Sequence, residues 1–385
     1  MITMRTPVLL AAGALLLQVS HACRATEEYS FEATSFSTAA ASSGDAEPLR
    51  LLKTSDDDSG TWVTEEEKIH EYMLKHVHFM DVTETQELEE LGASRHAALA
   101  KRQSPYPAPS RQSIANPIIA RLVQNNVQST ITGLSNIYNR YYRGSYAATS
   151  ASYVLNAVRS AASSNPAITV RQFTHSFNQP SVIATIPGTS PRRVIVTAHY
   201  DSINSASVTG RAPGADDNAS GVASILEALR ALAAARYAPG NTLEFHFYGG
   251  EEGGLLGARD VFNRYAADNV DVLAVLNQDM TGYSTNNVIA VYTDYVDAGL
   301  TTYMRRLVPV YTTLGLVTDR CGYGCSDHAA ARAAGYPASY VCADTMSDSS
   351  PYIHTANDTP RGSFYAHALQ HSRLTVGFLV EGSFW

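Results

Sequence analysis

The chain has 385 residues, of which 45% are hydrophobic and 17% are charged, a composition typical of a globular protein rather than a disordered one. Its formal net charge of -8 and the lack of a long Lys/Arg run in the sequence argue against nucleic acid or an anionic membrane as a partner. Four cysteines are too few for a disulfide-built scaffold.

The N-terminus has the pattern of a secretion signal. Arg5 precedes an apolar run over residues 7–19, and residues 20–22 (Ser-His-Ala) offer small side chains where a signal peptidase cleaves. An uncleaved membrane anchor is the alternative, but this run is short for a bilayer span and no later stretch is long and apolar enough. We therefore expect a signal peptide at 1–22, an extracellular mature protein and no membrane partner.

Residues 23–102 differ in character from the remainder of the chain, since they are rich in Ser, Thr, Asp and Glu and show only a weak helical pattern at 66–91. Lys101-Arg102 then precedes a Pro-rich, turn-forming stretch, which is typical of an exposed dibasic processing site. A solvated basic pair in a linker is the alternative. Because the pair separates a segment of low expected order from a dense globular one, we predict a propeptide at 23–102.

Residues 103–385 alternate between strand-like and helical patterns. Strand-like apolar runs are predicted at 167–173, 181–186, 193–198, 242–248, 272–278 and 288–293. Helices are predicted at 114–134, 151–162, 222–237, after Ser326 as far as Gly335, and at 363–380. This interleaving favours an α/β fold, a three-layer α/β/α sandwich with a mixed, mostly parallel central sheet, in one domain without an internal repeat.

Five polar clusters come after the predicted strands or lie in the loops beyond them, where open α/β sheets collect functional residues. They are His199-Tyr200-Asp201, Asp216-Asp217-Asn218, Gly249-Gly250-Glu251-Glu252, Asn277-Gln278-Asp279 and Ile353-His354-Thr355. Singly, each has a plain structural explanation, since adjacent acids often cap a helix and a strand-end histidine is often structural. Asp279 is harder to explain in this way, because a carboxylate after an apolar strand is costly unless it is paired.

Taken together, the two histidines, three carboxylates and one additional glutamate form a ligand set suited to two adjacent divalent metals. Imidazole and carboxylate without thiolate fit zinc or cobalt in a catalytic rather than a structural site. A metal pair needs a bridging carboxylate, lowers the pKa of bound water toward about 7 and polarises a carbonyl. A carboxylate that is not a ligand then accepts the proton, and the Glu251-Glu252 doublet supplies both kinds of side chain.

Five segments resemble peptidase family M28, and within it the secreted bacterial and fungal leucyl aminopeptidases. In matching order and spacing they are 212–221 (APGADDNASG), 251–257 (EEGGLLG), 278–281 (QDMT), 321–328 (CGYGCSDH) and 353–359 (IHTANDT). The similarity runs from about residue 113 to near the C-terminus. It implies a zinc exopeptidase-like fold and a two-zinc aminopeptidase.

The resemblance also implies roles for single residues. It assigns one zinc to His199 and Asp279, the other to Glu252 and His354, and the bridging position to Asp217. Glu251 would be the general base, Asp201 would orient His199, and Tyr323 would donate a hydrogen bond to the developing oxyanion. Every ligand position of the family is occupied by a competent residue.

An aminopeptidase needs a closed end for the free α-amine and a pocket for the first side chain. By the resemblance, Met280, Cys321, Tyr323 and Cys325 line part of an apolar pocket, which suggests Leu-like or other bulky apolar residues. Where relatives often carry a Met/Pro/Phe-rich segment, this chain has Ser-Tyr-Val-Cys at 339–342, so Tyr340 narrows or reshapes the pocket.

Several further residues have two interpretations. Cys321 and Cys325 are expected to form a disulfide, as the resemblance also implies, rather than a zinc site with His328. Cys342 is expected to be a buried free thiol, and Cys23 to lie in or beside the signal peptide. His367 and His371 are expected to be a solvated or partly packed pair rather than a metal site. The sequons at Asn218 and Asn357 lie inside motifs, and we expect neither to carry a glycan.

The sequence therefore predicts a secreted, monomeric metallo-aminopeptidase with two Zn²⁺ per chain that acts on peptides and proteins with free N-termini. The propeptide is expected to keep it inactive until cleavage at Lys101-Arg102. Alternatives on the same scaffold are a glutaminyl cyclase-type enzyme with one zinc, a non-catalytic binding domain and a carboxypeptidase.

Overall fold

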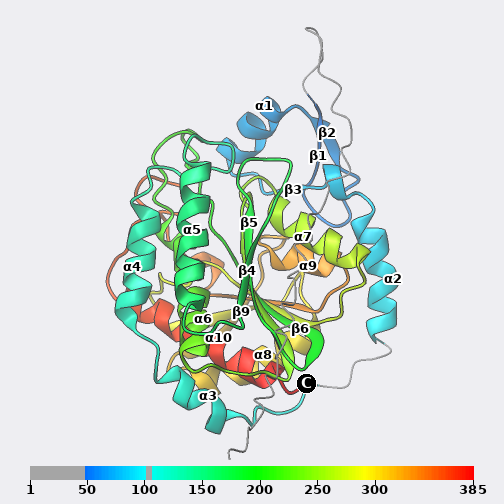
Figure 1. Cartoon of the computed structure of the whole chain (residues 1–385). Coiled ribbons are helices and arrows are strands. Elements are labelled where there is room, and N and C mark those ends of the chain that lie inside the picture. The colour runs from blue at the N-terminus through cyan, green and yellow to red at the C-terminus, as the bar shows by residue number, and fades with distance from the viewer. Residues whose placement is uncertain (1–47, 101–105) are drawn as a thin grey trace, which may run out of the picture. The chain divides into compact units, whose positions relative to one another are not determined.

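The computed structural model describes residues 48–100 and 106–385 (Figure 1). The predicted signal peptide and the predicted processing pair Lys101-Arg102 lie outside the described residues. Within the described ranges, no helix has the length and apolar character that a bilayer crossing requires.

An eight-stranded sheet forms the middle of the fold, in the order β10-β9-β11-β8-β6-β7-β5-β4. The four inner strands β11, β8, β6 and β7 run parallel, whereas β4, β5 and β9 pair antiparallel with at least one neighbour. The predicted mixed, mostly parallel sheet is confirmed. Its strands are β4 (Thr169–Phe173), β5 (Ser181–Ile186), β6 (Ser190–His199), β7 (Asn241–Tyr248), β8 (Val272–Gln278), β9 (Val288–Tyr292), β10 (Gly315–Asp319) and β11 (Ala338–Cys342).

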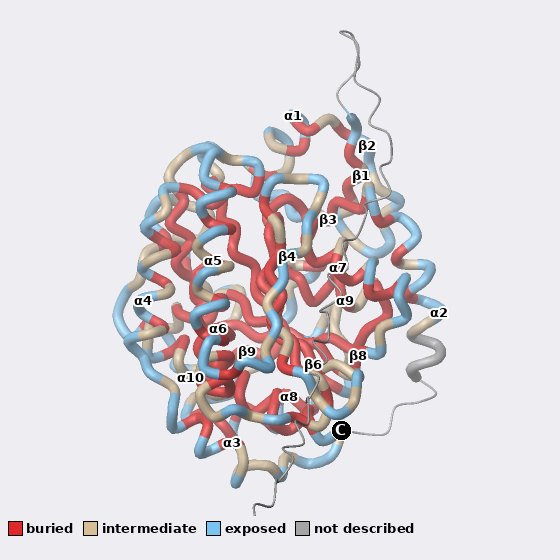
Figure 2. Tube along the Cα trace, in the orientation of Figure 1, coloured by how far each residue is buried: buried red, intermediate tan, exposed pale blue. Residues whose placement is uncertain are grey.

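The inner strands are buried along most of their length because both faces of the sheet are covered, and on β6 the buried part runs from Val194 to His199. On β6, Val194 and Val196 pack into one hydrophobic cluster and Ile195, between them, packs into the other. Figure 2 shows the buried residues concentrated along the strands and the inner sides of the helices. The three-layer arrangement is therefore confirmed.

Among the described residues, six helices pack into the first hydrophobic cluster, and two pack into the second together with the first residue of α2 (Leu88–Ala100). The first set is α3 (Gln112–Ile119), α4 (Gln124–Ser135), α5 (Ala147–Ala162), α6 (Gly221–Ala234), α8 (Ala298–Tyr311) and α10 (Phe364–Gly382). The second set is α7 (Leu256–Ala267) and α9 (His328–Ala333). Short helical turns, η4 (Ala215–Ser220) and η5 (Met346–Asp348), lie in connecting segments.

The single helix expected over residues 114–134 is two helices, α3 and α4. A tertiary contact explains the break between the two helices. The carboxylate of Glu227 on α6 accepts hydrogen bonds from the backbone N–H of Val123 (2.6 Å) and from the side-chain amide of Asn126 (3.0 Å). A distant acid thus supplies the acceptor at the start of α4, where the free N–H groups of a new helix need one.

Residues 50–100 are ordered, contrary to the low order expected from their polar composition. They form a three-stranded antiparallel sheet with several helical segments. These elements are β1 (Arg50–Lys53), β2 (Thr61–Val63), α1 (Glu65–Glu67), η1 (Lys68–Tyr72), η2 (Met73–Lys75), β3 (Met80–Asp81), η3 (Thr83–Thr85) and α2 (Leu88–Ala100). The few apolar side chains of this segment complete a core that α7 and α9 begin, since Met80, Val82 and Leu88 belong to the second cluster.

A buried ionic cluster fixes this N-terminal segment to the rest of the protein. Asp81 accepts from Arg50 Nε (2.8 Å) and Lys68 Nζ (3.0 Å), and Lys68 also donates to the hydroxyl of Tyr142 (3.2 Å). Lys68 and Asp81 are almost completely buried, so their charges are tolerable only because they are paired.

Candidate metal centre

The candidate site lies where β6, β7 and β8 end, because parallel strands bring their carboxyl ends to one edge of the sheet. His199 is the last residue of β6, the loop after β7 carries Glu251 and Glu252, and Asp279 comes directly after β8. Asp217 lies in η4, just before α6, and His354 lies in the loop that precedes α10.

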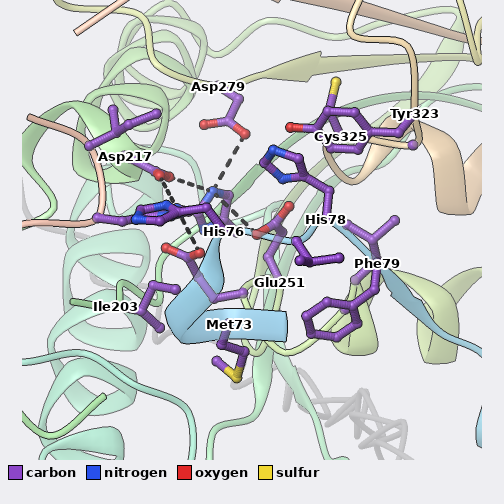
Figure 3. Close-up of a pocket in the computed structure, with 18 of the residues that line it drawn as sticks. Met73, His76, His78, Phe79, Ile203, Asp217, Glu251, Asp279, Tyr323 and Cys325 are labelled. Carbon is purple, nitrogen blue, oxygen red and sulfur yellow. Dashed lines mark ion pairs between the residues drawn. The ribbon is translucent and has the colours of Figure 1, made fainter. Parts of the chain in front are cut away.

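Two groups of imidazole and carboxylate meet there and share Asp217. His199 Nε2 lies 3.2 Å from Asp217 Oδ1 and 3.5 Å from Asp279 Oδ2. His354 Nε2 lies 2.9 Å from Asp217 Oδ2 and 3.0 Å from Glu252 Oε2. Asp217 therefore turns one oxygen to each imidazole, which is the placement a carboxylate needs to bridge two cations (Figure 3).

The donor set fits zinc. It consists of imidazole nitrogens and carboxylate oxygens that converge within ligand distance of one another, without a thiolate in either group. Glu252 Oε1 and Asp279 Oδ1 are buried and have no hydrogen-bond partner among the described residues. Unpaired buried carboxylate oxygens are costly unless a cation satisfies them.

Asp201 connects two parts of the centre. Its two oxygens accept the backbone N–H groups of Glu251 and Glu252, each at 3.0 Å, and Oδ1 lies 3.4 Å from His199 Nδ1. One buried carboxylate thus contacts the Nδ1 side of His199 and fixes the loop after β7. Metal-binding imidazoles are commonly oriented in this way.

Three buried polar groups that the sequence analysis did not single out support the centre. Asp358 accepts the backbone N–H of Asp217 at 3.1 Å, and Ser326 Oγ donates to Asp279 Oδ2 at 2.6 Å. Arg140 is fully buried beside the same loops. Asp358 and Ser326 stand inside segments quoted for the family resemblance, but Arg140 stands far from any motif and nothing in the sequence marks it.

Burial and crowded charge explain the pKa shifts at the centre. Burial raises the pKa of Glu251 well above its usual value, against the opposing effect of His199. Burial lowers the pKa of His199, but the carboxylates of Glu251 and Asp279 outweigh it and raise that pKa well above its usual value. Glu251 belongs to neither of the two imidazole and carboxylate groups, and perturbed pKa values of this kind are common at functional sites.

A cavity of about 240 Å³ opens onto the two groups. Of the five residues predicted to form the substrate pocket, four line this cavity: Met280, Tyr323, Cys325 and Tyr340. The fifth, Cys321, is not among the lining residues. Cys321 and Cys325 form a disulfide, as expected. The bridge holds the short loop that carries Tyr323.

The N-terminal segment enters the same cavity. Met73, His76, Val77, His78 and Phe79 line it, and Figure 3 shows the His78 side chain reaching toward Tyr323 and Asp279.

The remaining predicted features lie away from the centre or behind it. Cys342 is a buried free thiol, as expected. His367 and His371 are both buried; the imidazole of His367 contacts the carbonyl oxygens of Thr281 and Val288, and that of His371 contacts the side chain of Gln278. These two histidines are therefore packed rather than solvated. Asn218 is fully buried, whereas Asn357 is exposed.

Fold and site together define a metallohydrolase of the zinc-exopeptidase class. The chain matches the model of peptidase family M28 over residues 181–379. It is 41% identical over 337 residues to the probable leucine aminopeptidase 1 of Trichophyton verrucosum. The aligned region covers 83% of this chain and 88% of that protein. The leucine aminopeptidase 1 of Arthroderma otae is 41% identical with the same coverage. The chain belongs to peptidase family M28 and is a metallo-aminopeptidase.

Solved structures agree on the fold. The LapA aminopeptidase of Legionella pneumophila superposes with a TM-score of 0.75 at 24% identity, over 87% of this chain and 98% of that one. A glutaminyl cyclase from Porphyromonas gingivalis superposes with a TM-score of 0.58 at 16% identity, over 68% of this chain and 99% of that one. These likenesses establish a shared architecture.

Proposed function

We propose that this enzyme is secreted, binds two zinc ions per chain and releases single bulky apolar residues from the free N-termini of peptides and proteins. The observation that carries the proposal is the position of Asp217, whose two oxygens face two different imidazoles at 3.2 and 2.9 Å. One carboxylate shared in this way suits a pair of cations better than a single one.

The ligand assignment rests on the two groups of side chains. His199 and Asp279 would hold one zinc, His354 and Glu252 the other, and Asp217 would bridge them. When bound, the zinc pair would lower the pKa of a water molecule and polarise the carbonyl of the first peptide bond.

Glu251 would act as the general base. Its Oε2 lies 4.0 Å from His199 Nε2, so the carboxylate borders the metal-ligand groups. From there it can take a proton from the attacking water and return it to the leaving amine. Tyr323, which also lines the cavity, would donate its hydroxyl hydrogen to the oxygen of the substrate carbonyl as charge develops there.

The cavity supports a preference for bulky apolar first residues. Met280, Cys325 and the ring of Tyr340 line it, and Tyr340 is fixed by a ring contact with Tyr292 at a centroid distance of 4.7 Å. A rigid aromatic wall limits the depth of the pocket more firmly than a flexible methionine does.

We also propose that residues 23–102 are a propeptide that keeps the enzyme inactive until cleavage at Lys101-Arg102. The support comes from Tyr72, Met73 and residues 76–79, which line the cavity that a substrate must enter. Activity of the full chain before and after dibasic cleavage tests this part, and equal rates would rule it out.

One experiment tests the main proposal. Elemental analysis of the purified chain is expected to find two zinc ions, and the cleaved enzyme is expected to hydrolyse leucyl and methionyl chromogenic amides only without a chelator. One zinc together with cyclisation of N-terminal glutamine would favour the glutaminyl cyclase alternative. Hydrolysis of N-blocked peptides from their C-terminus would favour the carboxypeptidase. No transition metal in active protein would disprove the proposal.

A further inference from the structure

Arg140 is a fully buried arginine in the chain segment after α4, and all four of its side-chain hydrogen bonds recorded in the structure go to main-chain carbonyl oxygens. Nε donates to Tyr200 O (2.8 Å), Nη2 to Gly214 O (2.8 Å), and Nη1 to Leu134 O (3.2 Å) and to Pro213 O. A guanidinium is the side chain that can donate along several directions at once in a fixed plane.

Three of the four carbonyls that Arg140 holds belong to two metal-ligand segments, and the fourth, Leu134 O, belongs to α4. Tyr200 stands between His199 and Asp201, and residues 213–214 lead directly to Asp216 and Asp217. One side chain therefore sets the distance between the end of β6 and the loop that supplies the shared carboxylate.

A third segment is connected through the main chain of Arg140. Gln179, which is fully buried, donates from Nε2 to Arg140 O (3.0 Å) and accepts the backbone N–H of Gly250 at Oε1 (3.2 Å). Gly250 directly precedes the Glu251-Glu252 doublet. Arg140 and Gln179 thus join the segments that carry His199, Asp217 and Glu252.

Gly214 shows how closely the loop approaches Arg140. Its φ of +49° lies in the left-handed region, and a Cβ there would lie 2.6 Å from Arg140 Nη2 and 2.4 Å from Asp217 O. Only glycine fits between the guanidinium and the backbone of Asp217 without displacing one of them.

The charge of Arg140 also matches its surroundings. Burial lowers the pKa of the guanidinium to about 10, while the carboxylates of Asp358, Asp201, Asp217 and Glu252 counteract this shift. The side chain is therefore a cation at neutral pH within a centre rich in carboxylates. It offsets part of their mutual repulsion from outside the cavity, since Arg140 is not among the residues that line it.

We propose that Arg140 is a positioning residue of the metal centre, and that its guanidinium holds the His199 and Asp217 segments at the separation that zinc binding requires. This inference rests on the proposed two-zinc function. The inference attributes the positioning to the several N–H donors of the guanidinium, which point in different directions, and not to its positive charge alone.

The test compares Arg140→Met and Arg140→Lys in the full chain by zinc titration against a chromophoric chelator, and by kcat and KM after dibasic cleavage. We expect both variants to bind one of the two zinc ions about 10-fold to 100-fold more weakly, the range usual for groups that orient metal ligands. We also expect kcat to fall with KM within about threefold of the wild type, since the substrate pocket is not touched.

Arg259→Met is the matched control, because Arg259 is also almost fully buried but donates from Nε to Thr85 Oγ1 in the N-terminal segment. Its loss removes a buried cation without touching a metal-ligand segment, and its zinc affinity is expected to stay at the wild-type level. If Arg140→Met does not fold, the zinc affinity of Arg140→Lys tests the inference, because lysine retains the positive charge but lacks the planar set of donors of the guanidinium.

Wild-type zinc affinity in Arg140→Lys would overturn the inference, and so would an equal loss of affinity in Arg259→Met. Both results leave the proposed function intact as long as the wild-type chain binds two zinc ions. A wild-type chain that binds none would instead disprove the proposed function itself.

Discussion

The imidazole of His78 lies flat on the phenol ring of Tyr323, with ring centroids 3.9 Å apart and planes inclined by 16°. Tyr323 is the residue to which we assign the stabilisation of the substrate carbonyl oxygen, and His78 belongs to the segment proposed to be removed. A substrate carbonyl bound by Tyr323 in the proposed way would have to displace His78. The proposed inactivity of the uncleaved chain can therefore be tested at this one contact, between His78 and Tyr323.

Replacing His78 tests that connection. We expect His78→Ala to raise the activity of the uncleaved chain about fivefold, because a ring stack of this kind contributes about 1 kcal/mol. Hydrolysis of a leucyl amide by the uncleaved chain measures it. His70→Ala is the control, since His70 is exposed on the same segment. An uncleaved His78→Ala chain no more active than the wild type, with both equally active after cleavage, would contradict the role of this contact.

Substitution of the two adjacent glutamates, Glu251 and Glu252, is expected to impair the enzyme in different ways. Glu251→Gln should lower kcat about 100-fold to 10,000-fold with the zinc content unchanged, because general base catalysis is lost while the ligands remain. Glu252→Gln should lower the zinc content itself, since Glu252 Oε2 belongs to the group around His354. Metal analysis beside kcat separates the two effects. Loss of zinc in Glu251→Gln would show that the roles are assigned wrongly.

Tyr323→Phe is expected to lower kcat by about 100-fold or more with little change in KM, because the lost hydrogen bond forms chiefly in the transition state. Steady-state kinetics of the cleaved enzyme on a leucyl amide measures this. Tyr340→Phe provides the comparison, since Tyr340 lines the same cavity and we assign its hydroxyl no catalytic part. Equal effects of the two substitutions would point to packing and not to carbonyl stabilisation.

Removal of metal should make stability depend on pH. Burial raises the pKa of Asp358 to about 7 and that of Glu251 well above its usual value. Burial lowers the pKa of His354, but Glu252 and Asp217 outweigh it and raise that pKa well above its usual value. All three groups bind protons more tightly in the folded chain than in the unfolded one, so folding stability falls as pH rises through these folded pKa values.

We therefore expect the Tm of the chelated chain to fall by several degrees between about pH 5 and about pH 8. The zinc-loaded chain should change less, because the cations offset the carboxylates over that range. Thermal unfolding with and without chelator measures the difference. A chelated chain whose Tm rises with pH would show that the buried carboxylates are not the dominant groups.

Local pattern determined much of the architecture. The predicted bounds of β5 and β8 agree with the structure. A short apolar run between turn residues is too short for a buried helix, so in an α/β chain it forms a buried strand. Helices α7 and α8 and strand β10 were not predicted. Helix α8, for example, is capped by Asp297, whose side chain accepts the N–H of Leu300 at 2.7 Å, a start signal that the sequence does contain.

The N-terminal segment shows where composition misleads. Residues 50–100 have too few apolar side chains for a core of their own, and a segment judged alone by composition is expected to be poorly ordered. Met80, Val82 and Leu88 are buried because α7 and α9 leave apolar surface for them to cover. The free energy that orders the segment comes from a surface built by residues more than a hundred positions later.

The sequence by itself determined which chemical groups are available at the edge of the sheet, because strand periodicity and loop position place His199, Glu252 and Asp279 at neighbouring strand ends. Only the tertiary structure decided that Asp217 turns one oxygen to each imidazole, that Arg140 holds two of the segments together, and that His78 covers Tyr323. These relationships join residues far apart in the chain, and the direction of each side chain depends on the packing around it rather than on its neighbours in sequence.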